Sequence, residues 1–365
     1  MTRYLELLAP NGAVTTPLPA ASQAGIDVLQ NGGSATDAAI AALSVQLTAR
    51  ADMVDRQPLL DVLVWDPARA ALSGLRSASG DIELRLTISA ILKRFGCRSF
   101  SDLSAPAVAY ARKRLLLGRP ESPENAAHLW LTSDKPLTEP PATNWCDVES
   151  GQLLRFEISA PFASPGTVDL MLEPLRQEQP DPPPPGSLTS FMVRNPVRGK
   201  PAARAPRDVT PWPQVIAVDH RGMTASISAA PFDAAAGPVQ IVVSDAGKPV
   251  LWVAGAAGDE WTMVDITKRA LDSGLHVQAA IESPRHHCPR LGDGQPAVDW
   301  VCAERSRSRA AEDFERKMAE QRLRVRWQPR FDRSQGSVQA IAIDRRRGLL
   351  RAGADPRWGG QAAGY

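Results

Sequence analysis

Apolar residues recur with helical spacing near the amino terminus of the chain. In the run AASQAGIDVLQNGG, helical spacing places Ala21, Ala24, Ile26, Val28 and Leu29 on one buried face. A proline just before this run and two glycines at its end are typical of a helix start and a helix stop. The next stretch, SATDAAIAALSVQLTA, predicts a second helix whose small side chains allow close packing. The chain is therefore predicted to open with a helical hairpin.

Apolar runs in the second half predict paired strands. The stretch from Asp208 to Ser228, DVTPWPQVIAVDHRGMTASIS, predicts two strands joined by a tight turn at 220–222. PVQIVVSDAGKPVLWV predicts a second hairpin with its turn at Gly247-Lys248. The segment after Gly336 predicts a last strand pair, with the Arg345-Arg346-Arg347 triplet at its tip. Much of this half is therefore expected to form antiparallel sheet.

Further helices are predicted around these strands. Two are expected in ISAILKRFGCRSFSDLSAPAVAYARKR, another from Thr262 to about Ser273, and a short one in QAAIES. The charged run RSRSRAAEDFERKMAEQRLRVRW is predicted to be an amphipathic helix, because Phe314, Met318 and Leu323 have near-helical spacing. By contrast, Gln177 to Arg207 is rich in Pro, Arg and Gly and predicts an extended polyproline linker.

Composition limits the classes of function. The 365 residues include 42 basic and 40 acidic side chains, a formal charge of +2 that disfavours nucleic acid or an anionic membrane as the main partner. No run approaches the roughly 20 apolar residues of a membrane helix, and the first residues lack the apolar core of a secretion signal. We therefore expect a cytoplasmic protein. Its four cysteines, irregularly spaced, are expected to be reduced thiols.

A metal site is considered and set aside. His286, His287 and Cys288, with Cys302 further along, include residue types that bind zinc. However, adjacent side chains on an extended segment point in opposite directions, and no second ligand pair follows. We expect no metal and no cofactor.

Several ordered motifs together resemble one family. They are GAVTTPLPAASQAGIDVLQNGGSATDAAIAAL, RFGCRSFSDLSAPA, the VDHRG hairpin, SGLHVQAAIESPRHH and GADPRWGGQAAGY. In this order they resemble the γ-glutamyltranspeptidases (glutathione hydrolases), which belong to the N-terminal nucleophile hydrolases, over most of residues 11–175 and 210–365.

The resemblance implies an α+β fold, a four-layer αββα sandwich in which helices cover two packed antiparallel sheets. It implies a large-subunit-like region at 1–175 and a small-subunit-like region at 208–365, forming one composite globular domain. The segment 176–207 would replace the family's central helical stretch as a linker.

The resemblance also places the nucleophile, at a residue that cannot attack. With Val218, Asp219 and Gly222 as anchors, the family's threonine falls on Trp212, and an indole has no hydroxyl or thiol to act on an amide. The only nearby hydroxyl is Thr210, which needs a two-residue bulge to take the role. Pro211 after it fixes φ and removes a backbone donor.

Other positions of chemistry are altered as well. Ala234 to Pro238 stand in place of a serine pair that binds substrate carboxylate, and a glycine-rich turn is replaced by Asp55 to Asp61. Gly255-Ala256-Ala257-Gly258-Asp259 replaces the oxyanion-binding turn, so a carboxylate stands where negative charge would develop. The loop after Ser228 is also too short to build the family's pocket. Gly255 and Gly258 are kept as candidate substrate-binding residues, together with Arg76, which would pair with a substrate carboxylate although Ser77 replaces its usual Glu neighbour. The alternative for Arg76 is an ordinary surface arginine after a hairpin.

Three functions follow as hypotheses. The first is a catalytically degenerate member of the family that acts by binding or as a non-catalytic subunit. Its partners would be a γ-glutamyl or small amide ligand, a protein, or further copies in an oligomer. Trp212, Trp252 and Trp261 would line its remnant cleft. The second is an active amide hydrolase or transferase that uses Thr210 after self-cleavage at Val209-Thr210. The third is a peptide- or protein-binding module that works through the linker.

Overall fold

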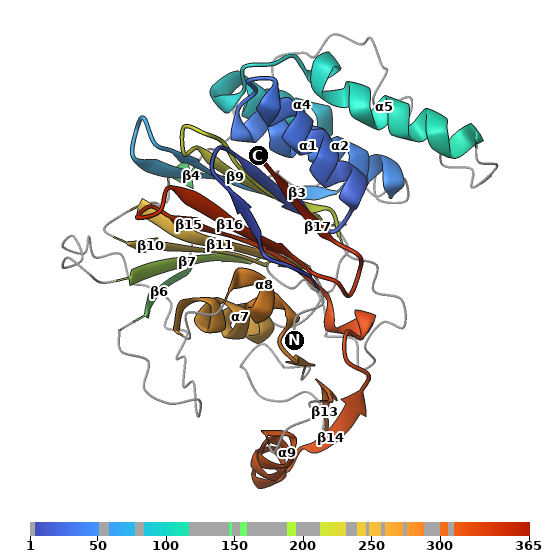
Figure 1. Ribbon diagram of the computed structural model, residues 1–365, viewed down its shortest axis with the longest axis vertical. Helices are drawn as coiled ribbons and strands as arrows, with labels where there is room; N and C mark the ends of the chain where they lie inside the picture. Colours follow the sequence, from blue (N-terminus) through green and yellow to red (C-terminus); the bar gives the residue numbers. More distant parts are fainter. Residues whose placement is uncertain are drawn as a thin grey trace.

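The computed structural model describes residues 4–50, 58–76, 84–116, 146–147, 154–158, 188–194, 212–230, 239–245, 248–256, 260–272, 276–287, 300–305 and 310–365. These residues form two large antiparallel sheets, the helices that cover them, and a small module built on a third sheet (Figure 1). None of the helices among them is long and apolar enough to cross a membrane.

The first large sheet contains the hairpin predicted around residue 220. Its strand order is β17-β2-β8-β9-β3-β4-β5. In that order the strands are Gln361–Gly364, Ala13–Thr16, Gln214–Val218, Thr224–Ala230, Leu59–Asp66, Ala71–Arg76 and Cys146–Asp147. This sheet thus combines strands from the amino-terminal and carboxy-terminal regions of the chain.

The second large sheet has the order β1-β16-β15-β11-β10-β7-β6. In that order its strands are Leu7–Ala9, Leu349–Ala354, Ser337–Asp344, Lys248–Ala256, Val239–Asp245, Leu188–Arg194 and Leu154–Ile158. The predicted hairpins β10–β11 and β15–β16 are therefore confirmed as neighbours in this sheet.

Helices cover the outer face of each large sheet. Those over the first are α1 (Pro19–Gln30), α2 (Ala35–Ala49), α4 (Leu84–Phe95) and α5 (Phe100–Leu116), and those over the second are α7 (Glu260–Asp272) and α8 (Val277–Glu282) (Figure 1). Each helix occupies a stretch in which the sequence predicted one. The predicted four-layer αββα arrangement is confirmed.

Strand β8 is largely apolar on both faces, which illustrates how the layers arise. In β8, Val215 and Ala217 belong to the core beneath the helices, whereas Ile216 and Val218 belong to the core between the two sheets. Successive side chains of a strand point to opposite faces, so an unbroken apolar run serves two cores at once.

Local signals fix the opening hairpin of helices. Pro19 occupies the first turn of α1, where its missing amide hydrogen is not needed. At the start of α2, Ser34 and Asp37 form a capping box, with each side chain accepting from the backbone amide of the other. Of the predicted apolar face, only Val28 is partly exposed.

Asp219 shapes the turn between β8 and β9. Its Oδ1 accepts from the amides of Arg221 and Met223, at 2.9 and 3.0 Å, and its Oδ2 accepts from Ala35 at the start of α2. Gly222 has a φ of +81°, a conformation that favours glycine. The aspartate and glycine that anchored the sequence comparison are thus structural residues.

A small module departs from the predicted long helix. It contains β12 (His286–His287), β13 (Trp300–Glu304), α9 (Ala310–Glu320) and β14 (Arg324–Gln328). The helix ends before Arg322, which has a φ of +59°, and the amide of Leu323 donates to the carbonyl of Met318 at 2.8 Å. The remaining RVRWQ alternates with period two and forms a strand, so that part of the helix prediction was wrong.

The proposed linker also contains regular structure. Leu188–Arg194 forms β7, which pairs with β6 and β10 instead of continuing as extended polyproline. The sequence LTSFMVR contains β-branched and aromatic residues and no proline, which favours a strand. The other residues of 176–207 lie outside the described part of the chain.

Candidate functional site

The start of β8 is where the sequence comparison places the nucleophile. Trp212 stands there, half-buried, with its side chain packed against the core beneath the helices. Pro213 follows, and its carbonyl accepts from the amide of Ala229 on the neighbouring strand at 2.8 Å. Thr210, the alternative nucleophile, lies outside the described residues. The position therefore presents a half-buried indole that packs against the core.

A buried carboxamide from helix α2 fixes the next residue. Gln46 Oε1 accepts from the amide nitrogen of Gln214 at 3.0 Å, and Gln46 Nε2 donates to its carbonyl at 3.1 Å. The side chain of Gln214 in turn donates to the carbonyl of Ser337 at 3.1 Å. Helix α2, the first sheet and the second sheet are thereby tied together at this end of the sandwich.

Strand register brings a predicted site residue to the same end. Gln214 is paired with Ser228, Ser228 with Asp61, and Asp61 with Arg76, in one row across the first sheet. Cross-strand partners in an antiparallel sheet have their Cβ atoms about 4.5–5.5 Å apart. The backbone of Arg76 thus lies at the same level of the sheet as the strand that begins beside Trp212. Its role as a carboxylate-binding residue stays a prediction.

The layer between the sheets is polar at this end. Gln240, on the second sheet, donates to the carbonyl of Asp61 at 2.8 Å across the layer. Gln214 Oε1, Gln240 Oε1 and Ser228 Oγ are buried and have no hydrogen-bond partner among the described residues. Because the amide groups of Gln214 and Gln240 already donate to carbonyls, their oxygens face the layer as acceptors. The local chemistry therefore favours hydrogen-bond donors.

Sequence reasoning missed this polar group, although a signal was present. Gln46, Gln214 and Gln240 are single glutamines inside otherwise apolar runs, SVQLTA, PQVIAV and PVQIVV. A polar side chain in such a run must find a partner inside the protein, because burial without one is costly.

Gly255 is at the same end, on β11, and has a packing role. A Cβ atom at this position would lie 2.1 Å from the sulfur of Met263 on α7. Glycine thus lets helix and sheet approach closely. Whether Gly255 also binds a ligand stays a prediction, and Gly258 lies outside the described residues.

The tryptophans do not form the expected lining. Trp252 is only 1% exposed and belongs to the core between the sheets. Trp212 packs against the core beneath the helices, on the other side of the first sheet. The side chain of Trp261 is outside the described part. The hypothesis that Trp252 lines an open cleft was wrong, because its ring fills the centre of the sandwich.

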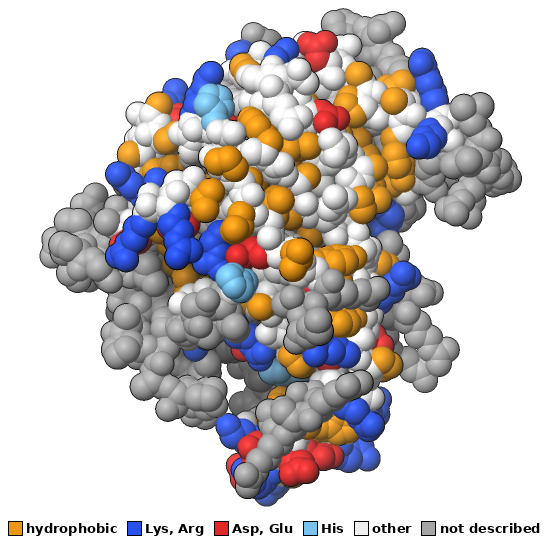
Figure 2. Space-filling view, in the orientation of Figure 1, with side chains coloured by type: hydrophobic (Ala, Val, Ile, Leu, Met, Phe, Trp, Pro, Cys, Tyr) orange, Lys and Arg blue, Asp and Glu red, His pale blue; other side chains and the backbone are white. Residues whose placement is uncertain are grey.

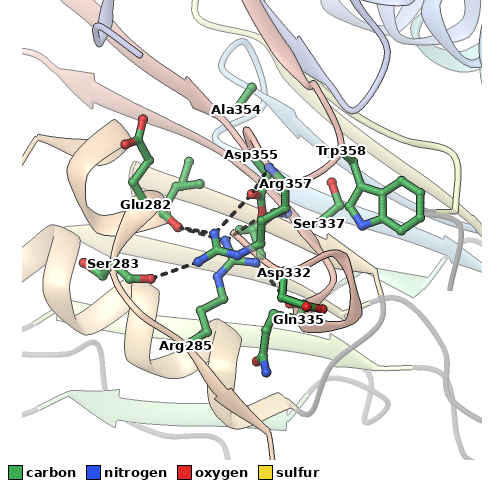
Figure 3. A network of polar contacts seen from close by, with 12 residues as sticks. Glu282, Ser283, Arg285, Asp332, Gln335, Ser337, Ala354, Asp355, Arg357 and Trp358 are labelled. Carbon is green, nitrogen blue, oxygen red and sulfur yellow. Dashed lines mark hydrogen bonds and ion pairs between the residues drawn. The ribbon is translucent and has the colours of Figure 1, made fainter. Parts of the chain in front are cut away.

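Two of the resembling motifs, SPRHH and ADPRW, meet in a buried ion network (Figure 3). Arg285 Nη2 lies 2.6 Å from Asp355 Oδ2, and Arg357 Nη1 lies 3.2 Å from Asp355 Oδ1. Arg357 also forms a two-point ion pair with Glu304, in which its Nε donates at 2.7 Å. Two positive and two negative side chains therefore cancel within the core.

Burial and pairing act against each other in this network. Burial lowers the pKa of the Arg285 guanidinium to about 10, against the opposing effect of Asp355. Burial also acts to lower the pKa of Arg357, but Asp355 and Glu304 outweigh it and the pKa is raised. The network joins α8, β13 and the end of β16, so these two motifs have a structural role.

One of the two adjacent histidines has a packing role. His286 contacts Phe314 of α9, with ring centroids 5.0 Å apart. His287 is paired in register with Cys302 on β13, and Cys288 lies outside the described part. Within the described ranges, no three metal-binding side chains come together.

Comparisons with known proteins support the fold. No family model matches the sequence, and no curated protein does. Among solved structures, cephalosporin acylase from Bacillus halodurans aligns with a TM-score of 0.65 and 13% identity, over 100% of this chain and 98% of that one. LmbA2991HD aligns with a TM-score of 0.63 and 14% identity, over 100% of both chains.

The chain shares the overall fold of these solved structures, which is like that of the N-terminal nucleophile hydrolases. At one end of the sandwich, β8 of the first sheet begins beside the polar group formed by Gln214, Ser228, Asp61 and Gln240. At this level of identity the likeness concerns architecture alone.

Proposed function

We propose that this protein is a non-catalytic relative of the γ-glutamyltranspeptidases that acts by binding, either of a small amide ligand or as a subunit of an assembly. The observation that carries the proposal is Trp212. It occupies the position of the expected nucleophile and packs into the core, where an indole cannot attack an amide.

The surrounding residues support a scaffold without the reaction. Gln46 holds the strand in place from helix α2, and Met263 fills the space beside Gly255. These contacts are those of a packed protein interior. The motifs shared with the family contribute the turn at Asp219 and the buried ion network, both of which stabilise the fold.

The proposed ligand class rests on the residues at one end of the sandwich. Arg76, Asp61, Ser228 and Gln214 form a row there across the first sheet. An arginine at that level can pair with the carboxylate of a γ-glutamyl compound. Isothermal calorimetry with glutathione and with glutamine tests this. We expect Arg76→Gln to weaken binding by about tenfold or more. Arg69→Gln, in the turn between β3 and β4 at the opposite end of the sheet, is the matched control.

Two measurements test the absence of catalysis. Electrophoresis and mass spectrometry of freshly purified protein should show one chain of 39.3 kDa. A chromogenic γ-glutamyl anilide should be hydrolysed no faster by the wild type than by Thr210→Ala. Two fragments that meet at Thr210, absent in Thr210→Ala, would overturn the proposal in favour of a self-cleaving enzyme.

A further inference from the structure

Strand β14 has one face packed and one face open. Val325 and Trp327 point toward α9, where Val325 packs with Phe314 and the Trp327 ring lies 6.2 Å from the Phe314 ring. Arg324 and Arg326 alternate with them and are exposed. The period of two thus separates an apolar face from a basic one.

An aromatic side chain orients the basic face. Trp300, on the neighbouring strand β13, is paired in register with Arg324. The guanidinium carbon of Arg326 lies 4.4 Å from the centroid of the Trp300 ring. Stacking of this kind restricts the arginine while its N–H groups point outward, so less side-chain entropy is lost when an anion binds.

Basic side chains predominate among the described residues on β14 and directly beside it. Arg305, Arg322 and Arg330 are also exposed beside the strand. Within the described residues 300–305 and 321–336, the two acidic side chains are both engaged. Glu304 is buried in the ion network, and Asp332 accepts from the amide and hydroxyl of Ser334. Helix α9 also carries acidic residues, but on a separate element. Figure 2 accordingly shows both basic (blue) and acidic (red) side chains in the lowest part of the molecule.

The strand also has an open edge. In the described part of the chain, β14 is the last strand of the order β12-β13-β14. Exposed charge on an edge strand prevents it from pairing with an identical edge, because like charges would meet. The same edge admits a strand of opposite charge.

We infer that β14 binds an extended acidic segment of a partner protein, which adds to the sheet as a strand. Carboxylates at alternate positions of the segment would lie on the same face as Arg324 and Arg326 and pair with their guanidinium groups, while backbone hydrogen bonds form along the edge. Single-stranded nucleic acid fits less well, because Arg326 already covers the ring of Trp300 on which a base would stack.

Fluorescence anisotropy on the full-length protein tests the alternation. The probes are a labelled peptide of repeating Glu-Thr and an isomer of the same composition with all Glu in one half. We expect the alternating peptide to bind more tightly than its isomer. Its affinity should fall as the salt concentration rises. Arg324→Gln with Arg326→Gln should weaken it by at least about tenfold. The matched control, Arg346→Gln with Arg347→Gln at the tip of β15–β16, removes the same charge and should leave binding unchanged.

Each contrary result rejects part of the inference. Equal binding of the two isomers would show a diffuse charge effect and overturn strand addition. Tighter binding of oligothymidine, lost in the same double variant, would assign the surface to nucleic acid. Hydrogen exchange gives an independent readout. The amides of residues 324–328 should become protected when the alternating peptide binds, and unchanged exchange would also overturn the proposal.

Discussion

The carboxamide of Gln46 satisfies both backbone polar atoms of Gln214, with its oxygen 3.0 Å from the amide nitrogen and its nitrogen 3.1 Å from the carbonyl oxygen. The Gln46 side chain thereby makes the two backbone hydrogen bonds that a neighbouring strand would otherwise make. It holds the first residue of β8, two residues after Trp212, at a fixed distance from α2. The backbone next to the position expected for the nucleophile is thus held by a contact from helix α2.

Removing this contact should cost stability. We expect Gln46→Ala to lower the free energy of unfolding by about 1–3 kcal/mol, because two buried backbone groups lose their partner. Urea denaturation measures the change. Gln23→Ala removes an exposed glutamine that bonds Asp27 within α1 and should have a much smaller effect. Equal effects of the two substitutions would contradict the role assigned to Gln46.

The buried ion network should be sensitive to the loss of one member. Arg357→Met leaves Glu304 charged and buried without its main partner, which we expect to cost about 3–5 kcal/mol in thermal or urea unfolding. Adding Glu304→Gln should restore part of the loss. Arg316→Met, which breaks an exposed pair with Asp313, should cost less than about 1 kcal/mol. If Arg357→Met also cost less than about 1 kcal/mol of unfolding free energy, the network would have to be accessible to water.

Gly255 and Met263 should behave as a coupled pair. We expect Gly255→Ala to destabilise the protein by about 1–3 kcal/mol, because the new methyl group meets the sulfur of Met263. The double variant with Met263→Ala should lose less stability than the sum of the losses in the two single variants, since the clash is gone. Strict additivity would argue that the glycine is needed for another reason. Unchanged stability with lost glutathione binding would favour a direct role in ligand binding.

The thiol of Cys97 should titrate at unusually high pH. Burial, the hydrogen bond from Sγ to Asp37 at 2.9 Å and the charge of that carboxylate raise its pKa above 9.0. The folded chain holds this proton more tightly than the unfolded chain. The stability gained is therefore complete below pH 9.0 and is lost as the pH rises through the folded value.

Alkylation measures this difference. In a variant with Cys146, Cys288 and Cys302 changed to Ser, the rate of iodoacetamide reaction should rise at higher pH in the folded protein than in urea. Identical profiles would show that Asp37 does not act on the thiol.

The sequence predicted those elements whose pattern and punctuation agree. Pro19 and the turn at Gly222 mark boundaries that depend only on neighbouring residues, and these boundaries are confirmed. The end of α9 was not predicted, because it depends on Arg322 adopting a positive φ that the sequence does not announce. Leu323 continued the helical spacing although it packs from beyond the helix end.

The site was predicted less completely than the fold. Trp212 and Arg76 came from the spacing of motifs, and the register of the first sheet brings both to one end of the sandwich. The glutamine contacts could not be predicted, because the partners Gln46 and Gln214 are 168 positions apart in the chain. Trp252 was misjudged because a large aromatic residue fits a core as well as a cleft, and only the packing of two sheets distinguishes them.

The ion network joins segments that are far apart along the chain: Arg285 and Asp355 are separated by 70 positions (355 − 285), and Glu304 and Arg357 by 53. Contacts of this span carry a large loop-closure entropy, so they form after local hairpins and helices. We therefore expect the four charges to be dehydrated late during folding. A chain arrested before that step would already have its helices and hairpins, yet its β13–β14 module would still tumble independently of the sandwich.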